Sequence, residues 1–392
     1  MSQASTGMIS GVFLPFFGAF LAWRGLSAGQ IGLLLSTALL LRALTGPVSG
    51  IIADAHNDRR SVMLVLYWIV FVGFGALAFT ASPILIFLAA VPAYVAYGAA
   101  TPLLESVCVR LSERYNFDYG RVRIWASTAF VMMNVAGGIG ARQLGIFVVA
   151  PMLAMAAALC IFSTLMLPAP PARDPKSKLM PRLRATFAET RELLGSGVFL
   201  VFLLAASVEQ ASHGFYYGYG GLHWRQLGYS ETLIGIIWPV GVLAEIVLFS
   251  QAQRILRVFD PCKLLLIGGF VCVVRWTILA FDPALPIVVF AQFLHGGTFA
   301  MAHLGAVFFI LRAVPQRLAA TAQSLYFVCS QGVMMGLATL LSGSVYGAIG
   351  GRAYLLMSVM GAVAMGLAVL LARRWHGGRI IHGTHDERVD TI

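Results

Sequence analysis

Apolar stretches of about 20 residues recur along the whole of this 392-residue chain. Each is long enough to cross a lipid bilayer as a helix. Only helices and closed barrels satisfy their backbone groups in lipid, and the alternating pattern of a barrel does not occur here. The sequence therefore predicts an all-α membrane protein with twelve transmembrane helices. We place these spans at roughly 6–22, 29–53, 62–82, 84–108, 123–141, 144–168, 197–221, 232–252, 263–281, 285–311, 318–346 and 350–372.

The distribution of charge predicts the orientation of the chain. Only 11% of the residues are charged, against about 25% in soluble domains. The net charge of +11 would by itself permit binding to nucleic acid, but most Lys and Arg residues fall in alternate connections between spans. The positive-inside rule then places both termini on the cytoplasmic side of a bacterial inner membrane. We expect the protein to lie in the lipid bilayer and not to bind nucleic acid. The first span has no basic segment before it, so a cleaved signal peptide is not expected.

One long polar stretch divides the spans into six and six. We predict an N-terminal six-helix bundle at 1–168, a cytoplasmic linker at 169–196, a C-terminal six-helix bundle at 197–372 and a cytoplasmic tail at 373–392. A short repeat supports this division, since Trp23-Arg24 and Trp224-Arg225 each follow the first span of a half. Parallel repeats of this kind predict two pseudo-symmetric bundles with substrate bound at their interface. We expect the protein to be a monomer.

Two charges flank the connection between the fourth and fifth spans. Glu105 and Arg123 lie equally far along the chain from Arg114, so antiparallel helices would place them at about the same depth. An isolated charge inside a span costs at least about 2.5 kcal/mol on insertion scales. Two interpretations follow: the pair contacts substrate, or it is a structural ion pair.

Further ionisable residues fall within the predicted spans of both halves. They are Arg42, Glu209, His213, Glu245, Arg275, His295 and His303. Arginine stays charged, whereas Glu and His change charge once their surroundings shift the pKa. Fixed cations with titratable neighbours favour proton-coupled transport of a small, anionic solute. Structural pairing of Arg275 with Glu245, and helix-to-helix hydrogen bonding by His303, are the alternatives. Glu209 is expected at the membrane interface, near the cytoplasmic half of the seventh span.

Aromatic residues accompany these charges. Tyr216 and Tyr217 stand close to His213 in the sequence, and Trp276 adjoins Arg275. A cavity with arginine and aromatic faces would suit an aromatic or planar acid. The alternative is an aromatic belt at the membrane interface.

Cysteine usage and motifs argue against metal binding and catalysis. The five cysteines form neither a CxxC pair nor a ligand-like cluster, so no metal and no cofactor is expected. The sequence contains no nucleophile elbow and no phosphate loop, and the connections are too short for a catalytic domain. We therefore do not expect an enzyme.

The first cytoplasmic connection carries a further pattern. Gly50 is followed by Asp54 and by the basic pair Arg59 and Arg60. This resembles the loop signature of the major facilitator superfamily, although two of its positions are not matched. Its role would be a charge contact that changes with conformation, and a solvated loop is the alternative.

The stretch FDYGRVRIW (117–125) resembles the corresponding connection of lactose-permease-like proton symporters. The whole chain resembles the 3-phenylpropionic acid transporter family of the major facilitator superfamily. The segments that carry the resemblance are GVFLPF (11–16), IGLLL (31–35), FDYGRVRIW (117–125), YYG (216–218), WPVGVLAE (238–245), VVRW (273–276) and LHGGTF (294–299).

The resemblance implies a twelve-helix fold, alternating access and proton-driven uptake. It implies that Glu105 and Arg123 contact substrate and that Arg275 and His295 belong to the coupling site. Glu245 lies within about a turn of another substrate-contacting glutamate of those permeases.

Two departures from the pattern affect proton coupling. The usual coupling carboxylate is Thr298 here, and the usual lysine three residues before the histidine is Gln292. Proton coupling must then use other groups, such as Glu245 or His295, or be absent.

The leading hypothesis is a secondary active transporter that takes up a small organic acid, such as 3-phenylpropionate or a related aromatic acid, together with protons. The expected substrate-binding residues are Arg42, Glu105, Arg123, His213, Tyr216, Tyr217, Glu245 and Arg275, and the expected proton-coupling residues are Glu245, His295 and His303. The alternative is a proton symporter for a neutral sugar or nucleoside. An exporter is disfavoured because the fifth span lacks a proline, and a non-transport membrane sensor or membrane enzyme is the remaining class.

Overall fold

The computed structural model describes residues 1–56, 58–168 and 179–381, and these residues form helices without a strand. Eleven helical stretches among them are long and apolar enough to cross a membrane. The last of these, Gln316–Arg374, contains both the eleventh and the twelfth predicted spans, because only a short 3₁₀ segment separates its final two long helices. The prediction of an all-α membrane protein is confirmed, and twelve spans are consistent with these stretches.

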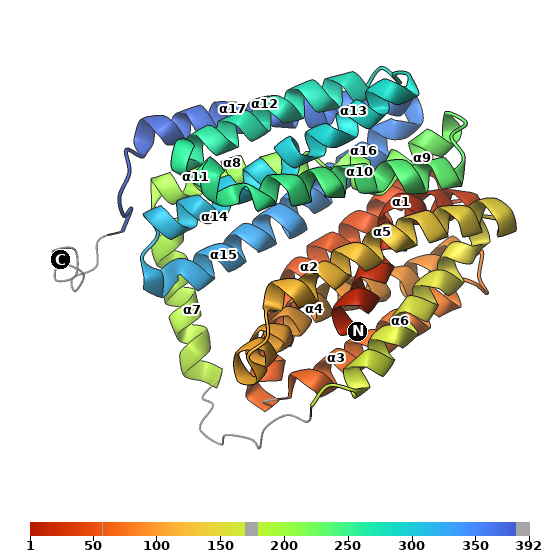
Figure 1. The fold of residues 1–392 in the computed structure, drawn as a ribbon, viewed down its shortest axis with the longest axis horizontal. Coiled ribbons are helices and arrows are strands. Elements are labelled where there is room, and N and C mark those ends of the chain that lie inside the picture. Colours follow the sequence, from red (N-terminus) through yellow and green to blue (C-terminus); the bar gives the residue numbers. More distant parts are fainter. Residues whose placement is uncertain (57, 169–178, 382–392) are drawn as a thin grey trace. The chain divides into compact units, whose positions relative to one another are not determined.

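The chain forms two compact units, and the first comprises Met1–Leu179, Gly214–Val242 and Gly336–Ala353. Its elements are α1 (Ser2–Trp23), α2 (Ala28–His56), α3 (Arg59–Ala76), α4 (Pro83–Tyr115), α5 (Tyr119–Leu144), η1 (Ile146–Val148), α6 (Val149–Leu165), α9 (Gly214–Gln226), the first part of α10 (Glu231–Ser250), nearly all of α16 (Met335–Ile349) and η5 (Gly350–Ala353) (Figure 1).

The second unit comprises Met180–His213, Leu243–Met335 and Tyr354–Ile392. Its elements are α7 (Leu179–Leu194), α8 (Gly197–Ala211), the rest of α10, α11 (Ala252–Val258), α12 (Pro261–Leu279), α13 (Leu285–His295), η2 (Gly296–Met301), α14 (Ala302–Ala313), η3 (Gln316–Leu318), α15 (Ala319–Phe327), η4 (Val328–Met334) and α17 (Tyr354–Arg374). The segments η2 and η4 are π-helical interruptions of longer helices.

These units are not the two sequence halves, because two segments from beyond the linker pack with the N-terminal residues. The division into six-helix halves stays a prediction. Within the linker and the tail, residues 169–178 and 382–392 lie outside the described part of the chain.

Short polar side chains set where several helices begin. Asp58, Asp118 and Asp260 each accept a hydrogen bond from a backbone N–H in the first turn of α3, α5 and α12. Such caps satisfy donors that have no partner inside the helix. At the end of α4, Asn116 adopts the left-handed conformation with φ 51° and ψ 50°, which asparagine tolerates better than most residues.

The amphipathic helix α7 is held to η3 by charge. Arg317 donates hydrogen bonds to both carboxylate oxygens of Glu192, and Nη1 lies 2.8 Å from Oε2. These hydrogen bonds hold the pKa of Glu192 below its usual value. Because the side chain of Arg317 is 51% exposed and that of Glu192 is 36% exposed, solvent screens the pair and it contributes little net stability.

Within the first unit, α1 and α9 approach each other closely through glycine. A Cβ atom added at Gly221 would lie 1.8 Å from the carbonyl oxygen of Pro15, and one at Gly18 would lie 2.3 Å from the carbonyl oxygen of Gly218. Small residues let membrane helices pack backbone to backbone. The contact therefore depends on the absence of side chains at these positions.

Replacing Gly221 by alanine should force α1 and α9 apart. Overpacking of this kind costs about 1–3 kcal/mol, so the thermal unfolding midpoint of the purified protein in detergent should fall. Gly29→Ala on α2 is the matched control, since a Cβ there meets nothing within 4 Å, and it should be neutral or slightly stabilising. A Gly221→Ala midpoint equal to that of the wild type would contradict this account of the contact.

Candidate functional site

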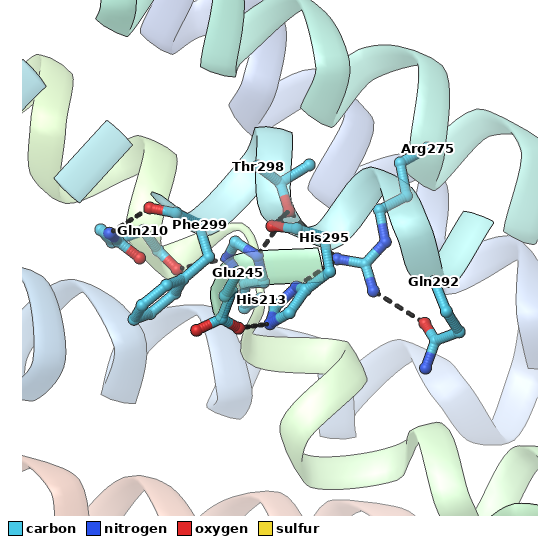
Figure 2. Close-up of polar contacts among 8 residues, drawn as sticks. All are labelled: Gln210, His213, Glu245, Arg275, Gln292, His295, Thr298 and Phe299. Carbon is cyan, nitrogen blue, oxygen red and sulfur yellow. Dashed lines mark hydrogen bonds and ion pairs between the residues drawn. The ribbon is translucent and has the colours of Figure 1, made fainter. Parts of the chain in front are cut away.

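Arg275 of α12 is the centre of a polar cluster in the second unit, and its side chain is fully buried. Its Nη1 donates to Nδ1 of His295 at 2.7 Å and to the hydroxyl of Thr298 at 3.1 Å, and its Nη2 donates to Oε1 of Gln292 at 2.9 Å (Figure 2). The guanidinium carbon lies 4.3 Å from the ring centroid of Trp276. These described hydrogen bonds all reach neutral side chains, while the cation itself remains inside the protein.

His295 connects Arg275 to a carboxylate. Because a guanidinium only donates, Nδ1 of His295 must be the acceptor, and the hydrogen of a neutral ring then sits on Nε2. Nε2 lies 2.7 Å from Oε1 of Glu245, whose side chain is 16% exposed. The order of donors is therefore Arg275 to His295 to Glu245. The cation and the carboxylate are separated by one imidazole ring.

The local backbone explains how Glu245 reaches His295. A Cβ atom at Gly296, the first residue of η2, would lie 3.0 Å from the carbonyl oxygen of Ala244. This close approach of η2 to α10 brings the residues next to Gly296 and Ala244 together. Single-turn π-helical segments occur often at functional sites, and η2 carries Thr298 into the same cluster.

A second chain of hydrogen bonds leaves Arg275 through Thr298. Nδ1 of His213 lies 3.0 Å from the carbonyl oxygen of Gln210, which can only accept, so this nitrogen carries the hydrogen of the neutral ring. Nε2 of His213 then accepts from the Thr298 hydroxyl at 3.0 Å. The ring of His213 also packs edge-on against that of Trp276. Arg275 is thus linked to a carboxylate through His295, and to His213, which follows α8, through Thr298 of η2.

In the first unit, Glu105 of α4 and Arg123 of α5 form an ion pair. The hydroxyl of Tyr119 donates to the other oxygen of Glu105, and Nη1 of Arg123 lies 3.4 Å from this hydroxyl. The Arg123 side chain is 57% exposed and that of Glu105 is 26% exposed. The carboxylate is therefore held by two donors, and much of the guanidinium is accessible.

The depths of these two residues differ from the prediction. The break between α4 and α5 falls after Tyr115 and not at Arg114. Glu105 is ten residues from the end of α4, about 15 Å along its axis, whereas Arg123 is four residues into α5, about 6 Å. The long arginine side chain spans the difference, so the two charges meet although their backbone positions lie at different distances from the helix ends.

The remaining predicted substrate residues lie in the first unit. Tyr216 is buried and stacks on Trp238 with ring centroids 4.3 Å apart, and Tyr217 packs against Tyr216. The side chain of Arg42 lies against Gly98 of α4, where an added Cβ would come within 2.2 Å of its Cδ. The structure therefore places these three residues in helix packing of the first unit, whereas it joins His213 to Arg275.

His303 of α14 lies among aromatic rings. The ring centroids of Phe249, Phe299 and Tyr326 are 6.0 to 6.4 Å from its own. It is near enough to Glu245 to interact electrostatically with the carboxylate. This position is consistent with a supporting role beside the Arg275 cluster.

The predicted conformational loop is described in part. Arg60 donates to the carbonyl oxygen of Leu165 at 2.6 Å, which ties the start of α3 to the end of α6. Gly50 lies within α2 and Arg59 begins α3, while the side chain of Asp54 lies outside the described residues. Asp58 caps α3; partial burial raises its pKa, but hydrogen bonds to Ser61 and the charge of Arg60 outweigh this and hold it below the usual value.

Sequence reasoning missed the roles of several polar residues. Gln292 and Thr298 were noted only as departures from a pattern, yet both accept hydrogen bonds from Arg275. Tyr119 stands in the FDYGRVRIW stretch, and its spacing of four residues before Arg123 on a helix is the signal that the two share a face. Glu209 is fully buried and does not lie at an exposed interface.

A helical chain with many apolar spans, a buried charge cluster in the second unit and an ion pair in the first belongs to the class of multi-pass membrane transporters. More particularly, the chain belongs to the MFS_1 like family, whose model matches residues 7–356. This confirms the resemblance to the major facilitator superfamily, and because the family and the relatives are transporters, the prediction of a non-enzyme is confirmed as well.

Two relatives and one solved structure illustrate the similarity. The chain is 28% identical to a probable 3-phenylpropionic acid transporter of Escherichia coli K12, covering 91% of this chain and 92% of the relative. It is 26% identical to a maltose permease of Geobacillus stearothermophilus, covering 93% and 91%. The crystal structure of the nucleoside transporter NupG matches with a TM-score of 0.80 at 17% identity, covering 95% and 96%, which shows the shared fold.

Proposed function

We propose that this transporter takes up a small organic acid, such as 3-phenylpropionate or a related aromatic acid, together with protons across the bacterial inner membrane. The observation that carries the proposal is the fully buried Arg275, which is joined to Glu245 through the neutral ring of His295. Similarity to a probable 3-phenylpropionic acid transporter supports the substrate class. The positive-inside pattern supports cytoplasmic termini.

The charges of the Arg275 cluster give a physical reason for coupling. With Glu245 ionised, Arg275, His295 and Glu245 together carry no net charge. Protonation of Glu245 leaves one positive charge, which a substrate carboxylate then neutralises. Each event favours the other, and reciprocal coupling of this kind typically amounts to 1–3 kcal/mol. The proton and the acid would thus bind as a pair, with His295 passing the proton and His303 modulating it.

Glu105 and Arg123 have a complementary role in this proposal. The accessible guanidinium of Arg123 offers donors to an anionic substrate, and Glu105 with Tyr119 orients it. Because Glu105 is already paired with Arg123, Glu105 is not proposed as a proton carrier.

The proposal predicts uptake of labelled 3-phenylpropionate into proteoliposomes that hold the purified protein. An imposed gradient, acidic outside, should accumulate the label several-fold above the level reached at equal pH. Liposomes without protein are the control for diffusion of the neutral acid across the bilayer. Uptake that is indifferent to the gradient would remove the coupling claim. Failure of every tested aryl acid to bind would remove the substrate claim.

A second candidate is proton-coupled uptake of a neutral sugar or nucleoside. The observation that favours it is the Glu105 carboxylate, which already accepts from a tyrosine hydroxyl and would accept from a sugar hydroxyl in the same way. Similarity to a maltose permease is consistent with this alternative. Competition for uptake by sugars or nucleosides, and none by aryl acids, would favour it over the first.

A further inference from the structure

One acid in the second unit takes part in neither hydrogen-bond chain. Glu209 of α8 is fully buried, and neither carboxyl oxygen has a hydrogen-bond partner among the described residues. It lies four residues before His213, near the C-terminal end of α8. The side chain occupies space that α12 leaves open, because a Cβ atom at Gly268 would lie only 1.9 Å from Oε1.

The surroundings of Glu209 require that it be neutral. Burying an ionised carboxylate without a partner costs several kcal/mol or more. The titratable groups that face it are the thiol of Cys272 on α12 and the phenol of Tyr326 on α15. Among the described residues, no titratable group of η2, η4, α14 or α17 interacts with Glu209. No described cation interacts with its carboxyl group either. In this conformation Glu209 therefore holds a proton.

The same surroundings argue against a metal ion as the bound cation. Hard cations take several oxygen ligands at once. On its α12 side, Oε1 of Glu209 faces Gly268, which has no side-chain oxygen to offer a cation. Among the described residues no group of three or more His, Cys, Asp or Glu side chains is arranged to hold a metal. A proton needs only the carboxylate itself.

We infer that Glu209 is a second proton-binding site of the transport cycle, protonated in this conformation and released to water when α8 and α12 separate. This inference rests on the proposed uptake of an organic anion. The proton on Glu245 balances the charge of the substrate carboxylate, so a proton carried by Glu209 adds one net positive charge for each substrate. Uptake would then respond to membrane voltage as well as to the pH gradient.

The test measures accumulation of labelled 3-phenylpropionate in proteoliposomes that carry an inside-negative potassium diffusion potential and no pH gradient. One net charge corresponds to about 50-fold accumulation per 100 mV at equilibrium. The wild type should approach this value. Glu209→Gln, which mimics the protonated acid, should lose the voltage response and keep uptake driven by a pH gradient.

Three further variants separate this role from a structural one. Gly268→Ala should behave like Glu209→Gln, because the added Cβ displaces the carboxyl group. Gly366→Ala on α17, where a Cβ meets nothing within 4 Å, should match the wild type. Ser207→Ala removes another buried polar group of α8 without a described partner and should also match it.

Several outcomes would overturn the inference. They are a wild type that ignores voltage, a Glu209→Gln variant that keeps the voltage response, and accumulation that depends on Na⁺. If the wild type transports no aryl acid, the proposed function fails, and infrared spectroscopy still tests Glu209. Its protonated carboxyl band should be present at neutral pH, shift in D₂O and be absent from Glu209→Gln. A missing band, or one that never exchanges, contradicts a proton site.

Discussion

Replacing Arg275 by lysine should reduce uptake of 3-phenylpropionate at least about 100-fold, although the charge is conserved. Lysine is a point charge on a flexible stem, whereas the arginine fork reaches His295, Thr298 and Gln292 at once. A lysine ammonium cannot hold these three acceptors in one geometry while presenting a donor to a substrate carboxylate. His295 would then lose the donor that fixes its tautomer towards Glu245.

The experiment compares binding and transport in the same protein. Thermal stabilisation by 3-phenylpropionate should disappear in Arg275→Lys, because a ligand stabilises only the state that it binds. Arg312→Lys is the matched control, since Arg312 is exposed near the end of α14, where its guanidinium lies over the ring of Phe308, and it should transport normally. If Arg275→Lys kept wild-type uptake, a point charge would suffice and the proposed fork geometry would be wrong.

The sequence predicted the helical membrane fold because the signal is strong and local. A run of about 20 apolar residues with few charges has few other stable solutions. The pairing of Glu105 with Arg123 was also accessible, since a short connection brings the neighbouring ends of two spans together. The position of the turn could not be predicted in this way. The helix α4 ends at its C-cap residue Asn116, which adopts the left-handed conformation, and not at the midpoint of the polar stretch.

For the cluster around Arg275, the sequence could predict which residues take part but not which of them contact one another. Charges inside spans identified Arg275, His295 and Glu245, but the rotation of each helix decides which of them meet. That rotation depends on contacts such as Gly296 against Ala244 and on the π-helical segment η2, which have no clear signal in one sequence. The burial of Glu209 likewise depends on the space at Gly268, a property of two helices together.

Tyr216 and Tyr217 show the limit of reasoning from sequence neighbours. They stand three and four residues from His213, which suggested one shared aromatic site. His213 lies in the break between α8 and α9. Tyr216 stacks on Trp238 in the first unit, while His213 bonds to Thr298 in the second. A substrate contact by these tyrosines stays a prediction.

Exchanging Glu105 and Arg123 should leave the fold intact and remove transport. The double variant Glu105→Arg with Arg123→Glu keeps one carboxylate and one guanidinium on α4 and α5, so an ion pair can form again and the thermal midpoint should stay close to that of the wild type. The hydroxyl of Tyr119, which now donates to Glu105, would face a guanidinium that offers no acceptor. The accessible cation would also move from α5 to α4.

The single variants complete the comparison and separate the two interpretations of the pair. Each leaves two like charges together and should lower the midpoint more than the exchange does, which a double-mutant cycle measures as a coupling energy. A purely structural pair would regain uptake on exchange, because only the attraction between the charges would matter. We expect uptake by the exchanged protein to stay at least about 10-fold below the wild type, since positioning a substrate depends on where the donor stands as well as on its charge. Recovery of uptake to the wild-type level would identify Glu105 and Arg123 as a structural pair and would leave substrate binding to the Arg275 cluster.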